Sequence, residues 1–526
     1  MASVVAHHLS GTSAMPDDQQ DIIAFLSDPS SYGKGVEQVE IIETHISLVF
    51  IAGDRAYKLK RAVKYAYLDF STVERRRQDC EAEVALNRRT APALYLEIRG
   101  IVRTAAGSIG FSSSGAAVDW VVVMRRFDQA LLFDALAKTG GLGPQLMDEL
   151  AGHIALFHTA AERHLDRGGA AEMADIAQTQ HHCLAAARQA GFVPEHVDKL
   201  LEKWGERLAA IAGLLDRRRA AGKVRRCHGD LHLRNICLVD GRPTLFDCLE
   251  FSEALASIDV LYDLAFLLMD LEHRGLAPFA NRVLNRYLDR TEEDDGLAAM
   301  PLFLSLRAAI RGHVTATAME RATGAAARAA MAAEARRYLD LAHRSLRREP
   351  CRLIAIGGVS GTGKSTLAAA LAPGLGSRPG ARVLRSDVIR KQLLGVDPET
   401  RLPASAYTRD VTRRVYDALC RKAAVGLSAG YSVIIDAVSL IPEERKSFAE
   451  VARAAAVPFS GLWLEGAAET MASRIRARRH DASDASPEIL AEQLRHDPGP
   501  IDWVRIDASV TPEECLAAAR HALAAV

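Results

Sequence analysis

The sequence predicts two domains of different fold class, an α+β domain followed by an α/β domain. Strand-like runs are concentrated between residues 39 and 127, and Ala- and Leu-rich segments with helical periodicity follow over 144–220 and 255–345. After residue 350, short apolar runs alternate with helical segments, a pattern typical of a parallel sheet with helices on both faces. A chain of 526 residues is long enough for about three or four compact units.

The composition indicates a folded protein in a reducing compartment. Hydrophobic residues make up 49% and charged residues 25%, which excludes wholesale disorder. The 66 basic residues equal the 66 acidic ones, so we do not expect a protein that coats nucleic acid or an anionic membrane. No two of the eight cysteines have CxxC spacing, and residues 1–20 lack the features of a secretory signal. We therefore expect a cytoplasmic protein without a disulfide framework.

The first elements of the N-terminal domain follow from local patterns. A hairpin turn is predicted at residues 53–54, between two β-rich runs. A helix is expected over 71–89, opened by Ser71 with Glu74 three residues on as a capping box. The strongly apolar run 118–127 predicts a further strand.

The domain limits follow from changes in composition. We predict a flexible tail over 1–20, an N-terminal domain over 21–345, and a C-terminal domain over 351–526. A β-like island over 224–251 separates the two helical blocks of the first domain. The predicted strands of the second domain are 352–357, 382–385, 432–436, 460–464 and 503–506.

A phosphate-binding loop is predicted at residues 358–365, which match GxxxxGK[ST] at every fixed position. The loop follows an apolar strand and precedes a helix-forming run, which is the setting that the motif requires. Its glycines let successive backbone N–H groups surround phosphate oxygens, Lys364 reaches the β- and γ-phosphates, and Ser365 offers its hydroxyl to Mg²⁺. The expected nucleotide-binding residues are Gly358, Ser360, Gly361, Thr362, Gly363, Lys364, Ser365 and Thr366.

Further polar residues follow the strands of this domain. Asp387 comes just past a strand end, where it could accept the proton of an attacking hydroxyl or only cap the next helix. Asp436 ends another strand and is a candidate Mg²⁺ carboxylate. Arg474, Arg478 and Arg479 could close over the nucleotide as a lid, or lie on a solvated helix face; we favour Arg478 as a nucleotide contact.

Together these motifs resemble the small P-loop kinases, the group that contains gluconate kinases, polynucleotide 5′-kinases and zeta-toxin-like enzymes. The resemblance rests on GGVSGTGKST, SDVIRK, VIIDA and the Arg-rich segment that leads to SDAS, and covers about 351–510. It implies that Asp387 is the general base. It also implies that Arg390 contacts a phosphate of the acceptor, and hence a phosphorylated or acidic acceptor.

A second constellation lies in the first domain. His228, Asp230 and Asn235 match HxDxxxxN, and Asp247 follows after a turn at 239–242. This spacing places an Asp and an Asn on one short loop and brings a second Asp from a neighbouring hairpin strand to the same phosphate tail. The alternative interpretation is a set of capping or turn-forming residues.

This domain resembles the aminoglycoside phosphotransferase family within the protein-kinase-like fold, over about 30–300. The resemblance implies that Asp230 accepts the acceptor's proton and that Asn235 and Asp247 hold Mg²⁺. It implies an N-lobe over about 21–127 and a C-lobe over the remainder, about 128–345.

The resemblance also implies an ATP-binding lysine at the end of an N-lobe strand. Lys58 and Lys60 point to the same face of that strand. We favour Lys58, because a small residue two positions earlier would then lie under the adenine. Glu83 is the expected partner on the following helix, with Glu81 as the alternative, and Met124 is expected at the edge of the adenine.

The sequence departs from the protein-kinase pattern at two places. No GxGxxG precedes Lys58, and residues 247–249 lack the glycine of the corresponding protein-kinase motif. Asp263 is expected to support the catalytic loop rather than to react.

The sequence therefore predicts a bifunctional phosphotransferase that uses ATP and Mg²⁺. Each domain would move a γ-phosphoryl group to a hydroxyl of a small molecule. One alternative is a nucleic-acid or nucleotide 5′-hydroxyl kinase in the C-terminal domain, with the N-terminal domain as an accessory. Another is a slow ATPase that acts as a switch or in a stress response. The acceptors, the activity of both sites and the oligomeric state stay open.

Overall fold

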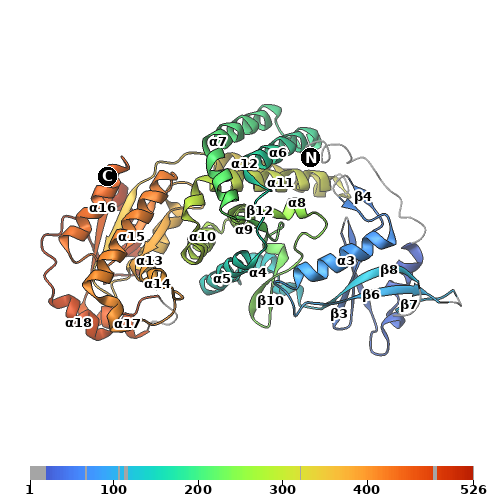
Figure 1. The fold of residues 1–526 in the computed structure, drawn as a ribbon, viewed down its shortest axis with the longest axis horizontal. Coiled ribbons are helices and arrows are strands. Elements are labelled where there is room, and N and C mark those ends of the chain that lie inside the picture. The colour runs from blue at the N-terminus through green and yellow to red at the C-terminus, as the bar shows by residue number, and fades with distance from the viewer. Residues whose placement is uncertain are drawn as a thin grey trace. The chain divides into compact units, whose positions relative to one another are not determined.

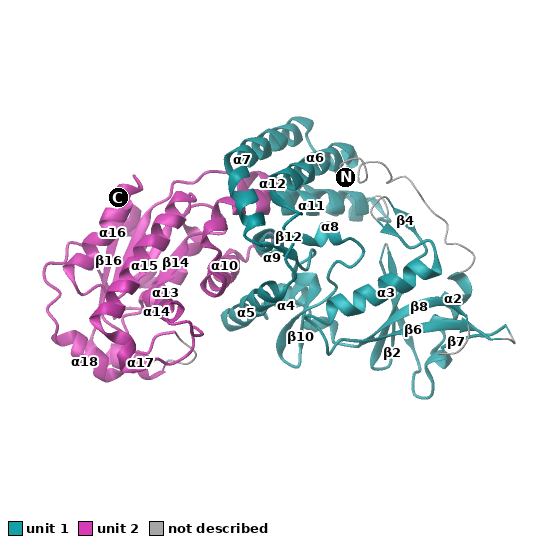
Figure 2. Ribbon diagram, in the orientation of Figure 1, with its two compact units in different colours: residues 1–270, 306–339 teal, residues 271–305, 340–526 magenta. Residues whose placement is uncertain are grey.

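The computed structural model describes residues 19–44, 46–65, 68–104, 107–111, 116–319, 322–477 and 482–524. The chain divides into two compact units, shown in different colours in Figure 2. Unit 1 comprises residues 1–270 and 306–339, and unit 2 comprises residues 271–305 and 340–526. This division differs from the predicted limits, because it also assigns 271–305 and 340–350 to the C-terminal unit.

The predicted tail lies almost wholly outside the described residues, and its last two residues belong to the fold. Gln19 is buried, and its side-chain amide donates to the Lys60 carbonyl at 3.0 Å and to Asp119 Oδ2 at 2.8 Å. Helix α2 begins at the next residue and covers Gln20–Ser27.

An antiparallel sheet of six strands forms the first part of unit 1, in the order β1-β2-β3-β8-β6-β7. Helix α3 (Val73–Asn87) packs on one face through Cys80 and Val84, and α2 packs on the other through Ile22 and Leu26 (Figure 1). The strands are β1 Val39–Glu43, β2 Ser47–Ala52, β3 Arg55–Lys60, β6 Tyr95–Arg103, β7 Ile109–Phe111 and β8 Ala117–Arg125, with a small hairpin of β4 Lys64–Tyr65 and β5 Leu68–Asp69.

The start of α3 differs from the prediction. Thr72, not Ser71, caps the helix, and its hydroxyl accepts from the Arg75 amide at 3.3 Å. The Ser71 hydroxyl instead donates to Asp69 at 2.5 Å. Two adjacent residues are equally suited to capping by type, and the carboxylate on the preceding strand decides between them.

Helices dominate the rest of unit 1, as predicted. The β-like island contains the hairpin β10–β11, whose turn residues Asp240 and Gly241 both have positive φ, as a tight hairpin turn requires. The helices that lie wholly or mostly in unit 1 are α4 Phe133–Thr139, α5 Pro144–Ala160, α6 Gly169–Ala186, α7 Pro194–Ala220, α8 Glu253–Ala256, α9 Val260–His273, α11 Met300–Ala318 and α12 Ala325–Ser345. The strands are β9 Val224–Arg226, β10 Ile236–Val239, β11 Arg242–Leu245 and β12 Ser257–Asp259; short 3₁₀ segments are η2 Pro29–Tyr32, η3 Gln129–Leu131, η4 Arg188–Ala190 and η5 Leu233–Asn235.

A parallel sheet of five strands forms the centre of unit 2, in the order β14-β15-β13-β16-β17. All five predicted strands are confirmed, as β13 Leu353–Gly357, β14 Arg382–Arg385, β15 Val433–Asp436, β16 Phe459–Glu465 and β17 Val504–Asp507. The other elements are α10 Ala277–Thr291, η6 Glu293–Ala299, α13 Lys364–Leu371, η8 Ala372–Gly374, α14 Ser386–Leu393, η9 Ala404–Tyr407, α15 Arg409–Ser428, α16 Pro442–Ala454, α17 Ala468–Ala477, α18 Pro487–Arg495 and α19 Pro512–Ala524.

Helices cover both faces of this sheet. Leu367 of α13 and Ala519 of α19 pack on Ile354, whereas Leu419 of α15 and Phe448 of α16 pack on the opposite face. Among the described residues, no helix combines the length and apolar character needed to cross a membrane. The eight cysteines are free thiols.

Gly461 on β16 offers a test of the sheet packing. A Cβ atom there would lie 2.2 Å from Trp503 Cγ, so we expect Gly461→Ala to destabilise the fold by about 1–3 kcal/mol through overpacking. The readout is the urea midpoint of unfolding. Gly466→Ala is the matched control, because its nearest new contact is an ordinary 3.5 Å to Ser509 Oγ. Equal midpoints for the two variants would contradict the packing.

Candidate active sites

Lys58 joins three segments of unit 1. Its Nζ lies 2.8 Å from Glu83 Oε1 on α3 and 2.6 Å from Asp247 Oδ1 on the loop after β11. Burial alone would lower the pKa of Lys58, but Asp247 and Glu83 outweigh it and hold the pKa well above its ordinary value. Burial would likewise raise the pKa of Glu83, but Lys58 and Lys60 lower it to about 2. Both groups are therefore charged at neutral pH.

Lys60 has a separate set of partners that the sequence did not predict. Its Nζ lies 2.6 Å from Asp79 Oδ2, 2.7 Å from Glu83 Oε2 and 2.6 Å from Glu250 Oε1. Burial raises the pKa of Glu250 to about 7, against the attraction of Lys60. Lys60 thus ties α3 to the loop after β11, whereas Lys58 contacts the predicted metal carboxylate.

Of the two candidate partners on α3, the structure places Glu83 beside Lys58. Glu81 is exposed and forms an ion pair with Arg77. Met124 is buried in an apolar cluster with Cys80 and Tyr95. A cavity of about 910 Å³ opens beside the end of β8, lined among others by Ile51, Arg126 and Phe127.

The predicted catalytic loop brings Asp230 and Asn235 together. The Asn235 side-chain amide donates to Asp230 Oδ2 at 2.9 Å, and His232 Nε2 lies 3.4 Å from the same oxygen. Burial would raise the pKa of Asp230, but His232 and Arg311 hold it far below its ordinary value. Backbone contacts join this loop to the segment that carries Asp247. The Phe246 amide donates to the Asn235 carbonyl at 3.0 Å, and His228 Nε2 lies 3.0 Å from the Phe246 carbonyl oxygen.

Asp263 supports this loop as expected. Its two oxygens accept the His228 and Gly229 backbone amides at 3.0 and 2.8 Å, and His158 Nε2 lies 3.1 Å away. Within the described part of the chain, one group of His, Cys, Asp or Glu side chains is compact enough to hold a metal ion. It consists of His158, Cys227 and Asp263. Burial raises the pKa of the Cys227 thiol well above its usual range, whereas a metal ligand must be a thiolate. We therefore interpret the three residues as a hydrogen-bonded support of the loop and not as a metal centre.

The phosphate loop of unit 2 has the backbone that its glycines predict. Gly358 has φ +127°, and a Cβ there would lie 2.4 Å from the Leu464 carbonyl oxygen. At Gly361 φ is +87°, and a Cβ would lie 2.6 Å from the Met471 carbonyl oxygen. Neither position accepts a side chain. Lys364 begins α13, and its Nζ donates to the Gly358 carbonyl at 2.8 Å, so the cation lies against the loop.

Ser365 and Asp436 meet at the carboxyl ends of two neighbouring strands. The Ser365 hydroxyl donates to Asp436 Oδ2 at 2.5 Å. Arg385 Nε lies 3.5 Å from the same oxygen, a contact that the sequence did not predict. The parallel register pairs Arg385 of β14 with Asp436 of β15. Because both residues end a predicted strand, their positions in the sequence could have predicted this ion pair.

A cavity of about 710 Å³ unites most of the predicted residues of this site. Asp387 lies in the first turn of α14, whose N-cap is Arg385, so the capping alternative is wrong. Burial raises the pKa of Asp387, and Asp436 adds to the effect, while Arg385, Ser483 and Lys364 oppose it. The cavity is lined by Ser360, Gly361, Gly363, Lys364, Ser365, Thr366, Asp387, Arg390, Asp436 and Arg474, among others.

Arg390 lines the cavity through a buried guanidinium. Nη1 donates to the Ala406 carbonyl at 2.9 Å, and the group lies 4.7 Å from the centre of the Tyr407 ring. The Tyr407 hydroxyl donates to Asp484 Oδ2 at 2.6 Å, a pair in the same cavity that the sequence analysis missed. The predicted lid contact Arg478 and its neighbour Arg479 lie outside the described residues.

Two family models match separate parts of the chain. The model of the phosphotransferase enzyme family matches residues 122–303, and a model described as an AAA domain matches residues 353–498. The first match contains Asp230 and Asp247, and the second contains the phosphate loop and Asp387.

Two relatives match nearly the whole chain. Uncharacterized protein Rv2004c of Mycobacterium tuberculosis (strain ATCC 25618 / H37Rv) is 32% identical over 501 residues, which cover 92% of this chain and 95% of the relative. Uncharacterized protein Mb2027c of Mycobacterium bovis (strain ATCC BAA-935 / AF2122/97) matches with the same identity and coverage. The chain belongs to the family of these mycobacterial proteins.

Solved structures resemble parts of this family member. A gluconokinase from Sinorhizobium meliloti 1021 is 24% identical and covers 34% of this chain and 97% of its own, with a TM-score of 0.25. A choline/ethanolamine kinase family protein from Mesorhizobium loti is 16% identical and covers 62% of this chain and 99% of its own, with a TM-score of 0.37.

The family models and the sheet topology agree on the architecture. The protein joins a protein-kinase-like phosphotransferase domain to a P-loop kinase domain with a parallel sheet. It is an ATP-dependent phosphotransferase.

The buried ion pairs of Lys60 should contribute to the free energy of unfolding. Lys60→Met leaves three buried carboxylates without their shared cation, and removing one partner from a buried ion pair costs about 3–5 kcal/mol. We expect a large drop in the urea midpoint at pH 7. Lys138→Met is the control, because Lys138 is 66% exposed and its helix-surface pair with Asp134 should contribute about 0.5 kcal/mol or less. A Lys60→Met midpoint as high as the control's would show that the cluster is not held by charge.

Proposed function

We propose that the protein is a bifunctional phosphotransferase that moves the γ-phosphoryl group of ATP to hydroxyls of small molecules at two sites. One observation supports this most: a single cavity in unit 2 is lined by Lys364, Ser365, Asp387 and Asp436. In unit 1 the corresponding groups lie in two pairs, Lys58 with Asp247 and Asn235 with Asp230. The free cysteines are in keeping with a reducing, cytoplasmic setting.

In the N-terminal site, Lys58 would hold the phosphates of ATP. Its pairing with Glu83 fixes the ammonium group before the nucleotide arrives, so little reorganisation is required. Asp230 would take the proton of the acceptor hydroxyl. Its low pKa keeps it ionised across the physiological range, and the Asn235 amide orients it.

In the C-terminal site, the phosphate loop and Lys364 would hold the β- and γ-phosphates. Asp387 would accept the proton of the acceptor hydroxyl. Burial raises its pKa, and Arg385 and Ser483 oppose that rise. Arg390 lines the same cavity as a buried cation and would face an anionic group of the acceptor.

Both sites offer the oxygen ligands that Mg²⁺ prefers. Asn235 and Asp247 would hold it in the N-terminal site, and Ser365 and Asp436, whose oxygens converge at 2.5 Å, in the C-terminal site. When bound, Mg²⁺ would neutralise the charge of the phosphoryl oxygens during transfer.

Replacing each base separates the two activities. We expect Asp230→Asn and Asp387→Asn each to lower transfer at its own site by about 10²–10⁴-fold, the usual contribution of a positioned base. The measurement is transfer of labelled γ-phosphate from ATP to compounds of a metabolite extract, run on the full chain. Each single variant should still transfer label at the other site, and only the double variant should lose both activities.

Two results would contradict this account. If both single variants transfer label as fast as the unmodified chain, neither aspartate is a base. If one single variant abolishes all transfer while ATP binding persists, the chain has one active site rather than two.

The two bases predict different pH profiles. A base must be ionised, so activity is lost as the pH falls through its pKa. The pKa of Asp230 is held below the ordinary value and that of Asp387 is raised above it. We therefore expect the Asp230→Asn chain, which reports on the C-terminal site, to lose kcat at a higher pH than the Asp387→Asn chain. The reverse order of the two acid limbs would overturn the assignment.

A further inference from the structure

The edge of the P-loop sheet is covered by a segment from a distant part of the sequence. Helix α10 and the 3₁₀ segment η6, residues 277–299, belong to unit 2 although they lie within the stretch matched by the phosphotransferase model, 122–303. They contact β14, which is the outermost strand at one side of the sheet. We call α10 and η6 together the bracket.

Asparagine amides of the bracket take the place of a neighbouring strand. Asn285 Oδ1 accepts from the Val383 backbone amide at 2.8 Å, and its Nδ2 donates to the Ala381 carbonyl at 3.1 Å. Asn281 Nδ2 donates to the same carbonyl at 3.0 Å. Backbone groups that an edge strand leaves unpaired are thereby satisfied, and the strand is held in one register.

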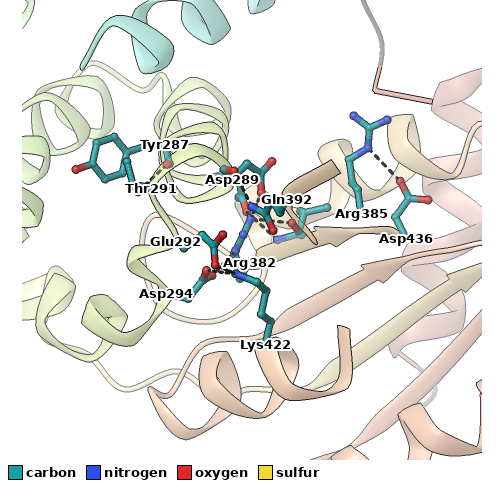
Figure 3. A network of polar contacts seen from close by, with 12 residues as sticks. Tyr287, Asp289, Thr291, Glu292, Asp294, Arg382, Arg385, Gln392, Lys422 and Asp436 are labelled. Carbon is teal, nitrogen blue, oxygen red and sulfur yellow. Dashed lines mark hydrogen bonds and ion pairs between the residues drawn. The ribbon is translucent and has the colours of Figure 1, made fainter. Parts of the chain in front are cut away.

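A buried ion pair network fixes the same strand. Arg382 is 1% exposed in its side chain, and its guanidinium lies 2.7 Å from Asp289 Oδ1 and 2.6 Å from Asp294 Oδ1 (Figure 3). Asp294 also lies 3.4 Å from Lys422 on α15. Burying such charges costs desolvation that an apolar edge would avoid, so the network is weak evidence for added stability.

The bracket also holds the helix that carries the proposed base. Gln392, near the end of α14, donates through Nε2 to the Asp289 carbonyl at 2.6 Å (Figure 3). The strand–helix unit β14–α14 is therefore attached to the bracket at both ends. Between the two attachments lie Arg385, which pairs with Asp436, and Asp387. Burial raises the pKa of Asp387, and the charge of Arg385 opposes that rise.

We propose that the bracket positions the proposed base of the P-loop site, with Arg382 and Gln392 as positioning residues; this rests on the proposed role of Asp387. The bracket fixes β14–α14, and with it Arg385 and Asp387, relative to the phosphate loop on β13. The working P-loop kinase unit then includes residues 277–299 and does not start at the predicted limit near residue 351.

The test uses the full chain with Asp230→Asn, so that the C-terminal site alone is read. Mg²⁺ and γ-labelled ATP are supplied with water as the acceptor, and phosphate release is followed between pH 4 and 9. Gln392→Met removes one hydrogen bond, and the triple variant R382M/D289N/D294N removes the charges together so that no lone charge stays buried. Arg505→Met is the matched control, because Arg505 lies on the opposite edge strand β17 in an exposed pair with Glu465.

We expect both bracket variants to lower kcat by about tenfold or more, since small displacements of a catalytic group are costly. The KM for ATP should stay within about twofold, because the phosphate loop is untouched. Burial and Asp436 raise the pKa of Asp387, whereas Arg385, Ser483 and Lys364 oppose the rise. The acid limb should therefore move to higher pH when Arg385 is no longer held in position on β14. Arg505→Met should change none of the three.

Two results separate failure of this proposal from failure of the proposed function. If adding Asp387→Asn abolishes phosphate release while the bracket variants keep kcat and the acid limb unchanged, the bracket does not position the base. A loss of kcat equal at every pH and matched by the unfolded fraction in circular dichroism overturns it in the same way. If adding Asp387→Asn changes nothing, the base role fails and the bracket proposal falls with it.

Discussion

The ion pairs between a buried cation and several carboxylates hold the functional elements of both units in place. A lysine or arginine without water must be neutralised by nearby acids, and in this chain those acids come from distant segments. Lys58 contacts α3 and the loop after β11 through Glu83 and Asp247. Lys60 contacts the same two segments and shares Glu83 with Lys58. Arg382 connects β14 to α10 and η6. Each cation therefore fixes the relative position of elements that carry functional groups.

The buried cations lie at different places in the sheets of the two units. In unit 1 the cations lie on an antiparallel strand beneath a helix, and their acids include Asp247, the proposed metal ligand. In unit 2 the cation lies on the outer strand of a parallel sheet, three residues before Arg385 and five before Asp387. In both units an ion pair network holds an element that carries a proposed phosphotransfer group, so charge fixes that element before any ligand binds.

Local signals in the sequence were sufficient for the strands and for the motifs. The phosphate loop, the Asp230–Asn235 loop and the five strands of the second sheet are short patterns whose physics is contained within a few residues. The contact of Lys60 with Glu250 and that of Asn285 with the Val383 amide could not be predicted, because they join segments about 100 residues or more apart. The contact of Lys60 with Asp79 is shorter in sequence, but several acidic residues of the following helix were equally suitable partners. The choice of Thr72 over Ser71 goes with a local contact, the hydrogen bond from the Ser71 hydroxyl to Asp69 two residues earlier.

The most direct test of two assembled sites is the stoichiometry of ATP binding to the full chain, measured by isothermal titration calorimetry with Mg²⁺. The account predicts two ATP molecules per chain, and one after Lys364→Ala, which removes the cation of the phosphate loop and leaves unit 1 intact. A single ATP bound by the unmodified chain, or a stoichiometry that Lys364→Ala does not change, would contradict it.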